Sequence, residues 1–282
     1  MLFRSFPSSV LAIPSFFKNG VSLKFEKDFK IWMLILFWVV LILFSIVHTK
    51  IIHYSSMAWF PVTFLGAYFV HNLLEKRIEW KLYISVIVGS IGYFIAFLFT
   101  AFPFFAMNIK KLIPYVDDKF AQENMKAEVY WTGFESLIGI LLGVLVFISL
   151  KWFKEGKTYR AAVSLFSGTG LTIFFAAAII APKIERYSQG AAIDFFKGKV
   201  GEDCYVQVLG FKSYAHFFYT QKLKPINTNS YNTEWLVNGE IDKPVYFVSK
   251  LDRPEEYENK PTLKELYRKN GFVFLKREIP VK

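Results

Sequence analysis

Two long stretches without a charged residue, separated by a short polar segment, constrain this chain more than any other feature. Residues 31–47 and 55–74 contain no Asp, Glu, Lys or Arg. At a rise of about 1.5 Å per residue, helices of these lengths match or nearly match a hydrocarbon core of roughly 30 Å. The sequence therefore predicts two membrane-spanning helices joined by a polar hinge, which we define as residues 44–54, with the sequence FSIVHTKIIHY.

The composition supports a membrane protein. Hydrophobic residues make up 54% of the chain and aromatic residues 19%, and the mean hydropathy is +0.31, which is too apolar for an ordinary soluble domain. The net charge of +11 is explained by basic loops beside the apolar runs and by anionic lipid surfaces. Because no zinc-finger, RNP or basic-helix pattern accompanies the charge, we expect no nucleic-acid partner.

We expect a polytopic α-helical membrane region over residues 1–182 and a small α/β domain over residues 183–282. The five predicted spans are 31–47, 55–74, 82–106, roughly 133–150, and 161–181. In the fourth, Gly139 and Gly143 have the spacing that lets another helix approach closely. The segment 1–17 contains Pro7 and Pro14 and is too short to span. We interpret it as the end of a helix that begins before this sequence, so we expect the C-terminal part of a longer protein.

Basic residues in the short loops predict the orientation. The loops 75–81 and 151–160 are rich in Lys and Arg, whereas the hinge carries only Lys50. The positive-inside rule then places these two loops in the cytoplasm, and the hinge, the 107–132 loop and the tail outside. The predicted localisation is a multi-pass protein of a bacterial inner membrane with a periplasmic C-terminal domain.

The tail after residue 183 has the pattern of a small α/β domain. It suggests a helix at 185–197 and strands at 204–209, 244–249 and 272–275. Thr262 and Glu265 have the spacing of a capping box, which predicts a helix from 262 to 269 ended by Asn270 and Gly271. Alternating strands and helices favour some parallel strand pairing.

The hinge also resembles a segment of the family 39 glycosyltransferases, which include bacterial aminoarabinose transferases and relatives of protein O-mannosyltransferases. The residues that carry the resemblance are Ser45, His48, Lys50, His53 and Tyr54, followed by an apolar helix. The Lys-x-x-x-Tyr spacing of the family's hinge is kept, but Ile52 replaces the usual proline and a second proline after the tyrosine is absent. The similarity of residue pattern covers about residues 3–75.

The resemblance implies a partial GT-C fold. It implies transfer of a sugar from a polyprenyl-phosphate carrier to a lipid or protein acceptor on the outward face. Lys50, His53 and Tyr54 would bind the lipid phosphate, since an ammonium, an imidazole and a phenol can each donate to a phosphate oxygen. In the family, the catalytic acids and much of a divalent-metal site lie upstream of anything in this sequence. We therefore expect no activity from this chain alone, and any metal to be shared with that part.

Other chemistry receives weaker support from the sequence. His48 and His53 have no third ligand nearby, so this segment alone predicts no closed zinc site. Adjacent Asp117 and Asp118 are more typical of a solvated loop than of a catalytic pair. The lone Cys204 allows no disulfide within the chain. Aromatic residues of the tail, such as Tyr205, Tyr219 and His216, are expected to pack or to lie on the surface.

Two functions remain open from the sequence. The first is a C-terminal fragment of a lipid-linked-sugar glycosyltransferase. The second is a non-enzymatic membrane scaffold that anchors an extracytoplasmic binding domain, with the hinge serving only as an interfacial anchor in which Lys50 snorkels and Tyr54 joins an aromatic belt.

Overall fold

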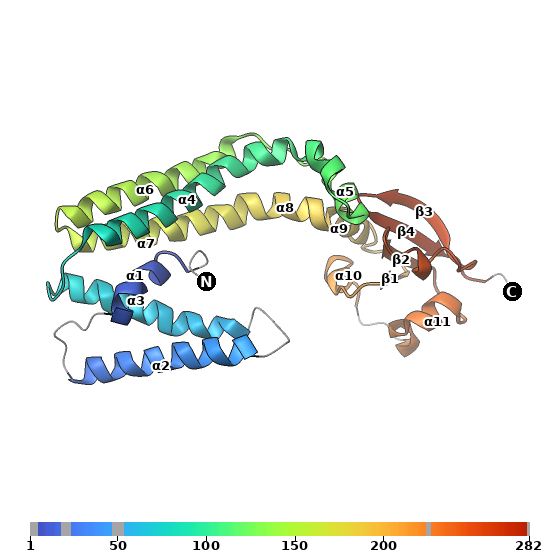
Figure 1. Cartoon of the computed structure of the whole chain (residues 1–282). Helices are drawn as coiled ribbons and strands as arrows, with labels where there is room; N and C mark the ends of the chain where they lie inside the picture. Colours follow the sequence, from blue (N-terminus) through green and yellow to red (C-terminus); the bar gives the residue numbers. More distant parts are fainter. Residues whose placement is uncertain (1–4, 18–23, 47–53, 224–226, 281–282) are drawn as a thin grey trace. The chain divides into compact units, whose positions relative to one another are not determined.

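The computed structural model describes residues 5–17, 24–46, 54–223 and 227–280. The chain forms two compact units, one of residues 1–103 with 132–178 and one of residues 104–131 with 179–282. The second unit thus combines the predicted tail with the segment between the third and fourth spans. The α-helices and β-strands of both units are labelled in Figure 1.

Helices dominate the first unit. Its elements are α1 (Ser8–Phe17), α2 (Lys24–Ile46), the 3₁₀ helix η1 (Tyr54–Ala58), α3 (Trp59–Leu74), most of α4 (Leu82–Met107), the 3₁₀ helix η3 (Phe134–Ser136), α6 (Leu137–Lys154) and α7 (Thr158–Phe175). A π-helical turn, η4 (Ala176–Ile180), joins α7 to α8 (Ala181–Ser188). Pro182 follows this turn. It lacks the backbone N–H that, in a regular α-helix, would donate to the carbonyl four residues earlier.

The five predicted spans are confirmed. Five helical runs are long and apolar enough to cross a membrane: Lys24–Ile46, Ser56–Leu74, Leu82–Met107, Phe134–Lys154 and Thr158–Ser188. The segment before them forms only the ten-residue helix α1. The chain is therefore a multi-pass α-helical membrane protein with a small C-terminal α/β domain, as the sequence predicted.

Helices α1, α3, α4, α6 and α7 share one apolar core. Leu11 of α1, Val88 of α4, Leu142 of α6 and Leu165 of α7 are almost completely buried in it. The predicted close approach at Gly139 is confirmed, because a Cβ added there would lie 2.4 Å from the Ala96 carbonyl oxygen of α4. The glycine therefore lets the backbones of α4 and α6 come into contact.

Contacts at the helix ends agree with the predicted alternation of sides. Glu26 at the start of α2 forms a 2.7 Å ion pair with Arg77 of the 75–81 loop. Trp80 of that loop stacks on Phe153 at the end of α6, with ring centroids 3.8 Å apart. The start of α2, the 75–81 loop and the end of α6 therefore lie on one side.

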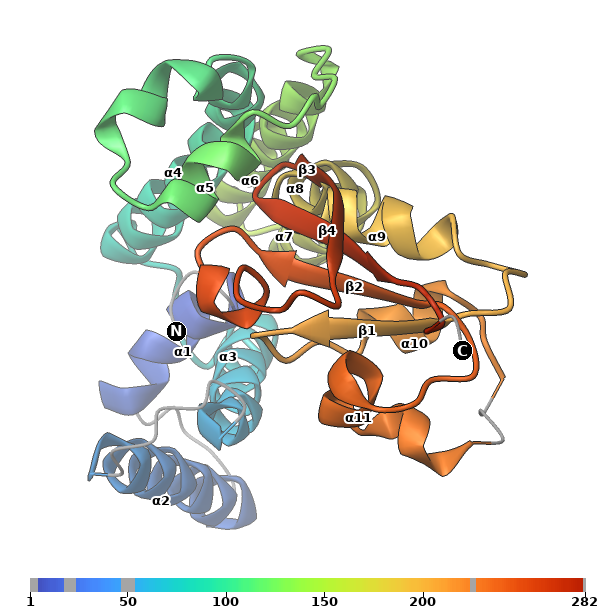
Figure 2. The ribbon, with the colours of Figure 1, turned by 90° about the vertical axis from the view of Figure 1, so that its right-hand side faces the viewer.

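A four-stranded mixed sheet forms the centre of the second unit. Its strands are β1 (Tyr205–Leu209), β2 (Val245–Lys250), β3 (Lys264–Lys269) and β4 (Phe272–Arg277), in the spatial order β1-β2-β4-β3 (Figure 2). The expected parallel pairing is confirmed for β1 and β2, while β4 is antiparallel to both β2 and β3.

Short helices surround this sheet. They are η2 (Ile109–Tyr115), α5 (Lys119–Met125), α9 (Gly190–Lys197), α10 (Ala215–Tyr219), η5 (Thr228–Tyr231), α11 (Thr233–Asn238) and η6 (Pro254–Glu256). One sheet face, with Phe247 and Leu275, packs against Leu236 of α11. The other face, with Val248 and Phe274, packs against Phe196 of α9. This alternation follows the period of two in strands β2 and β4.

The predicted helix at 262–269 is wrong, because Lys264–Lys269 form the edge strand β3. Asn270 and Gly271 have φ angles of 47° and 80°, the left-handed pair required by a tight hairpin turn. Thr262 does not cap a helix and instead donates a hydrogen bond from Oγ1 to the Val237 carbonyl, at 3.1 Å. The Asn-Gly pair was thus a hairpin turn rather than the end of a helix.

Candidate functional site

The predicted lipid-phosphate site lies largely outside the described residues. Lys50 and His53 fall in the range 47–53, and of Tyr54 only its place as the first residue of η1 is described. The roles assigned to these three residues therefore stay predictions.

A pocket of about 540 Å³ lies in the second unit where two spanning helices end, and we call it the juxtamembrane pocket. Its walls come from the end of α4, the start of η2, the extended segment before α6, and α8. The lining residues are Ala106, Met107, Ile109, Lys110, Ala127, Glu128, Val129, Tyr130, Trp131 and Tyr187. The pocket therefore combines an apolar wall with a basic, an acidic and several aromatic groups.

Polar contacts of Trp131 and Lys183 hold one wall of this pocket. The indole Nε1 of the buried Trp131 donates to the Tyr187 hydroxyl at 3.0 Å. The Lys183 ammonium lies 5.1 Å from the Trp131 ring centroid and donates to the Tyr130 carbonyl at 2.8 Å. These contacts connect α8 to the segment 127–131 and orient the aromatic side chains.

The chemistry of the juxtamembrane pocket suits an amphipathic molecule. Met107 is the last residue of α4, and Tyr130 precedes α6. Both are large, exposed side chains. Trp and Tyr prefer the boundary between hydrocarbon and water, and Lys extends from there toward headgroups. Lys110 is exposed at this boundary and can pair with a lipid phosphate.

Sequence reasoning did not identify the juxtamembrane pocket. The pair Tyr130 and Trp131, placed directly before the fourth span, is typical of an aromatic belt and could have pointed to this boundary. The contribution of Tyr187 could not be predicted, because it lies 56 residues away from its partner Trp131.

Other residues considered in the sequence have structural roles. Asp118 accepts hydrogen bonds from the backbone N–H groups of Phe120 and Ala121, at 2.8 and 3.2 Å, and so caps α5. Glu135 is buried at the start of the fourth span and accepts a 2.9 Å hydrogen bond from Gly133 N. Within the described ranges, no group of three or more His, Cys, Asp and Glu is placed to hold a metal ion.

Comparison with known proteins yields one similar solved structure. No family model matches the chain, and no curated protein matches it. A crystal structure of ArnT from Cupriavidus metallidurans in the apo state is similar over 85% of this chain and 44% of that chain, with 11% sequence identity and a TM-score of 0.49. The present chain thus spans less than half the length of that structure.

Proposed function

We propose that this chain is part of an integral-membrane glycosyltransferase of the GT-C type. The reaction moves a sugar from a polyprenyl-phosphate carrier to a lipid or protein acceptor on the outward face. The observation that carries the proposal is the hinge pattern Lys50-x-x-x-Tyr54, which resembles family 39 and connects two helices long enough to span.

The order of the spans supports this assignment. Two spans, α3 and α4, lie between the hinge and the 104–131 segment in the sequence, so an alternating topology expects both on the same side of the membrane. That segment packs with the α/β part. The proposal puts the hinge on the periplasmic side, because the positive-inside rule expects the basic loops 75–81 and 151–160 in the cytoplasm.

The hinge can stabilise a leaving phosphate without supplying a base. Lys50 provides a positive charge, and Tyr54 and His53 provide donors, at the point where negative charge develops on the carrier phosphate. An inverting transfer also needs a general base for the acceptor hydroxyl. In this proposal, the base and any divalent metal come from the part of the family's fold that precedes this sequence.

Substitution of the hinge in the longest reading frame that contains this chain tests the proposal. Transfer from a polyprenyl-phosphate sugar is measured in membranes with matched protein levels. Lys50→Ala should lower the rate on the order of a hundredfold, and Tyr54→Phe should lower it less, because removing a charged donor costs more than removing a neutral one. Lys81→Ala, at the opposite end of a span, is the control and should keep the wild-type rate.

A membrane scaffold is the second candidate, favoured by the separate apolar core of the α/β part. It predicts that the hinge variants alter only membrane insertion. Wild-type transfer by both Lys50→Ala and Tyr54→Phe would remove the role proposed for the hinge.

A further inference from the structure

A pocket of about 340 Å³ lies in the first unit between the end of α3 and the start of α4, and we call it the basic-loop pocket. Phe69 of α3 and Ile84 of α4 line it and are almost completely buried. The other lining residues belong to the 75–81 loop and the first turn of α4: Lys76, Arg77, Ile78, Glu79, Lys81 and Tyr83. The lining therefore combines apolar side chains with three cations and one carboxylate.

Two of these cations have no partner within the described ranges. The ammonium groups of Lys76 and Lys81 are exposed and form no ion pair or hydrogen bond with any described residue. Arg77 differs, because its guanidinium forms the 2.7 Å ion pair with Glu26. The two lysines are therefore the groups of this pocket that can bind an added anion.

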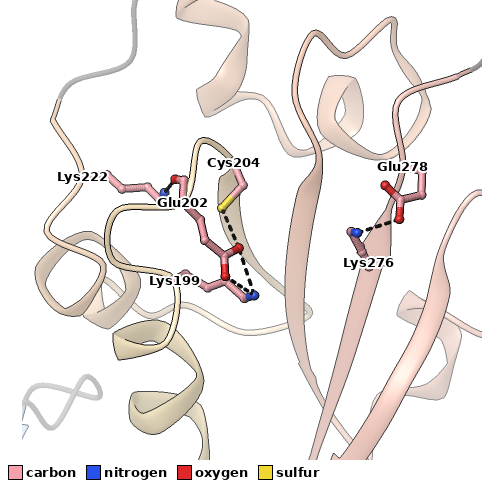
Figure 3. Close-up of polar contacts among 6 residues, drawn as sticks. All are labelled: Lys199, Glu202, Cys204, Lys222, Lys276 and Glu278. Carbon is pink, nitrogen blue, oxygen red and sulfur yellow. Dashed lines mark hydrogen bonds and ion pairs between the residues drawn. The ribbon is translucent and has the colours of Figure 1, made fainter.

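Lysines of the α/β part show a different arrangement. Lys199 Nζ lies 2.9 Å from a Glu202 carboxylate oxygen, and Lys276 Nζ lies 2.6 Å from a Glu278 carboxylate oxygen (Figure 3). A carboxylate close in the sequence thus offsets each of these charges. The two lysines of the basic-loop pocket lack such a carboxylate among the described residues, which leaves their charge to a ligand.

The backbone at Lys76 does not require a lysine. This residue directly follows Glu75, the C-cap of α3, and has a φ of 55°. Glycine adopts this left-handed conformation at the lowest cost and is the usual residue at such a helix end. Replacement of Lys76 by glycine therefore removes the charge and keeps the turn.

The start of α4 adds partial positive charge to the same pocket. The helix begins at Leu82, and Tyr83 and Ile84 of its first turn line the pocket. The N-terminal end of a helix favours negative charge, because its first N–H groups have no carbonyl partner within the helix. Together with the two lysines, this end of α4 suits a phosphate group.

An exposed apolar stripe on α4 begins next to the pocket. Leu82, Val86, Tyr93 and Phe97 are 70%, 57%, 41% and 65% exposed. Their spacing of four, seven and four residues places them on one face of the helix. A phosphate pocket beside such a stripe matches a molecule with an anionic headgroup and apolar chains. It matches a small soluble anion less well.

The surrounding charge also favours an anionic ligand. The start of α2, the 75–81 loop and the end of α6 lie on one side, and residues 24–30, 75–81 and 151–160 hold ten Lys and Arg but five Asp and Glu. The positive-inside rule accounts for this excess of cations at the ends of the spans. It does not account for a pocket that two unpaired lysines share.

We propose that the basic-loop pocket binds the phosphate headgroup of an anionic phospholipid. Lys76, Lys81 and the start of α4 hold the phosphate, and the acyl chains lie along the exposed stripe of α4. Basic pockets between spanning helices are suited to such headgroups, and a volume of about 340 Å³ is at the lower end of the range for ligand pockets. The proposal goes beyond the transfer reaction and does not depend on it, because the pocket lies at the end of α3 opposite to the hinge.

Lipid binding by the full chain in a neutral detergent tests the proposal. Native mass spectrometry measures the bound fraction during titration with phosphatidylglycerol. Parallel titrations use phosphatidylcholine with the same acyl chains, and glycerol 3-phosphate as the soluble anion. Wild type should bind phosphatidylglycerol at least fivefold more tightly than either of the other two.

Variants of Lys76 separate a role in binding from a role in folding. Lys76→Gly should weaken phosphatidylglycerol binding about fivefold, because a basic residue near anionic lipid contributes about 1 kcal/mol. It should not lower the midpoint of thermal unfolding, because glycine suits the left-handed turn. Lys76→Arg keeps the charge and should bind within about twofold of wild type.

Lys154→Ala is the matched control. Lys154 is the last residue of α6, is exposed and does not line the pocket, so this variant loses the same charge at the same side. It should bind as wild type does. An equal loss of affinity in Lys154→Ala and Lys76→Gly would assign the effect to diffuse charge and overturn the proposal. Equal binding of the two phospholipids, equally tight binding of glycerol 3-phosphate, or unchanged affinity in Lys76→Gly would also overturn it.

Discussion

The membrane helices and the α/β part differ in where their apolar side chains lie. In the five spans, only 17% to 50% of the most apolar window is buried within the protein. Strand β2 has four of its six residues buried and the other two partly buried. The membrane helices thus leave at least half of these windows unburied, whereas strand β2 is surrounded by protein.

This difference indicates two sources of stability. Lipid tails are as apolar as Leu, so burial of apolar surface adds little to contact between spanning helices, and close packing at small residues matters more. In the α/β part, removal of apolar surface from water is the main favourable contribution.

The largest effect is expected at Gly139. An added Cβ would lie 2.4 Å from the Ala96 carbonyl oxygen and from the Thr100 backbone nitrogen, so Gly139→Ala should force α4 and α6 apart. We expect a loss of about 3 kcal/mol, the upper end for overpacking. Thermal unfolding of the detergent-solubilised chain measures it. Gly170→Ala is the matched control, because nothing lies within 4 Å of its added Cβ. Equal stability of the two variants would contradict the proposed packing role.

A pH effect of intermediate size is expected from His216 in the α/β part. Burial lowers its pKa to about 4 from an ordinary 6.5, so the unfolded chain binds the proton more readily. Stability from this group is therefore complete above pH 6.5 and is lost as the pH falls toward 4. We expect a loss of about 2 kcal/mol between pH 8 and pH 5, measured by hydrogen exchange of strand amides. His216→Phe should remove this pH dependence; an unchanged dependence would assign it to other groups.

The smallest effect is expected at the β3–β4 turn. Gly271 has a φ of 80°, and an added Cβ would lie 2.8 Å from the Phe120 ring. Gly271→Ala should cost about 1 kcal/mol from the left-handed backbone, plus the displacement of that ring. Gly201→Ala has the same φ and nothing within 4 Å, so it measures the backbone cost alone. The midpoints of chemical unfolding compare the two, and no loss in Gly271→Ala would contradict the turn assignment.

Local pattern predicted much of this molecule. The spans followed from uncharged runs, and strands β1, β2 and β4 followed from apolar runs ended by turn residues. The helix predicted from the capping box at Thr262 was wrong, because the same residues also suit an exposed, charged edge strand. Pairing with β4 favoured the strand over the helix. The role proposed for the hinge rests on its sequence alone, because residues 47–53 lie outside the described ranges.

What the sequence by itself determined is the class of the molecule: five spans and a small mixed domain after them. These features depend on hydropathy, segment length and charge, which are properties of residues adjacent in the sequence. Only the tertiary structure decided that Trp131 meets Tyr187, and that His216 lies buried beside Phe217. Burial and contact of this kind depend on how helices and strands distant in the chain pack together, which local pattern does not specify.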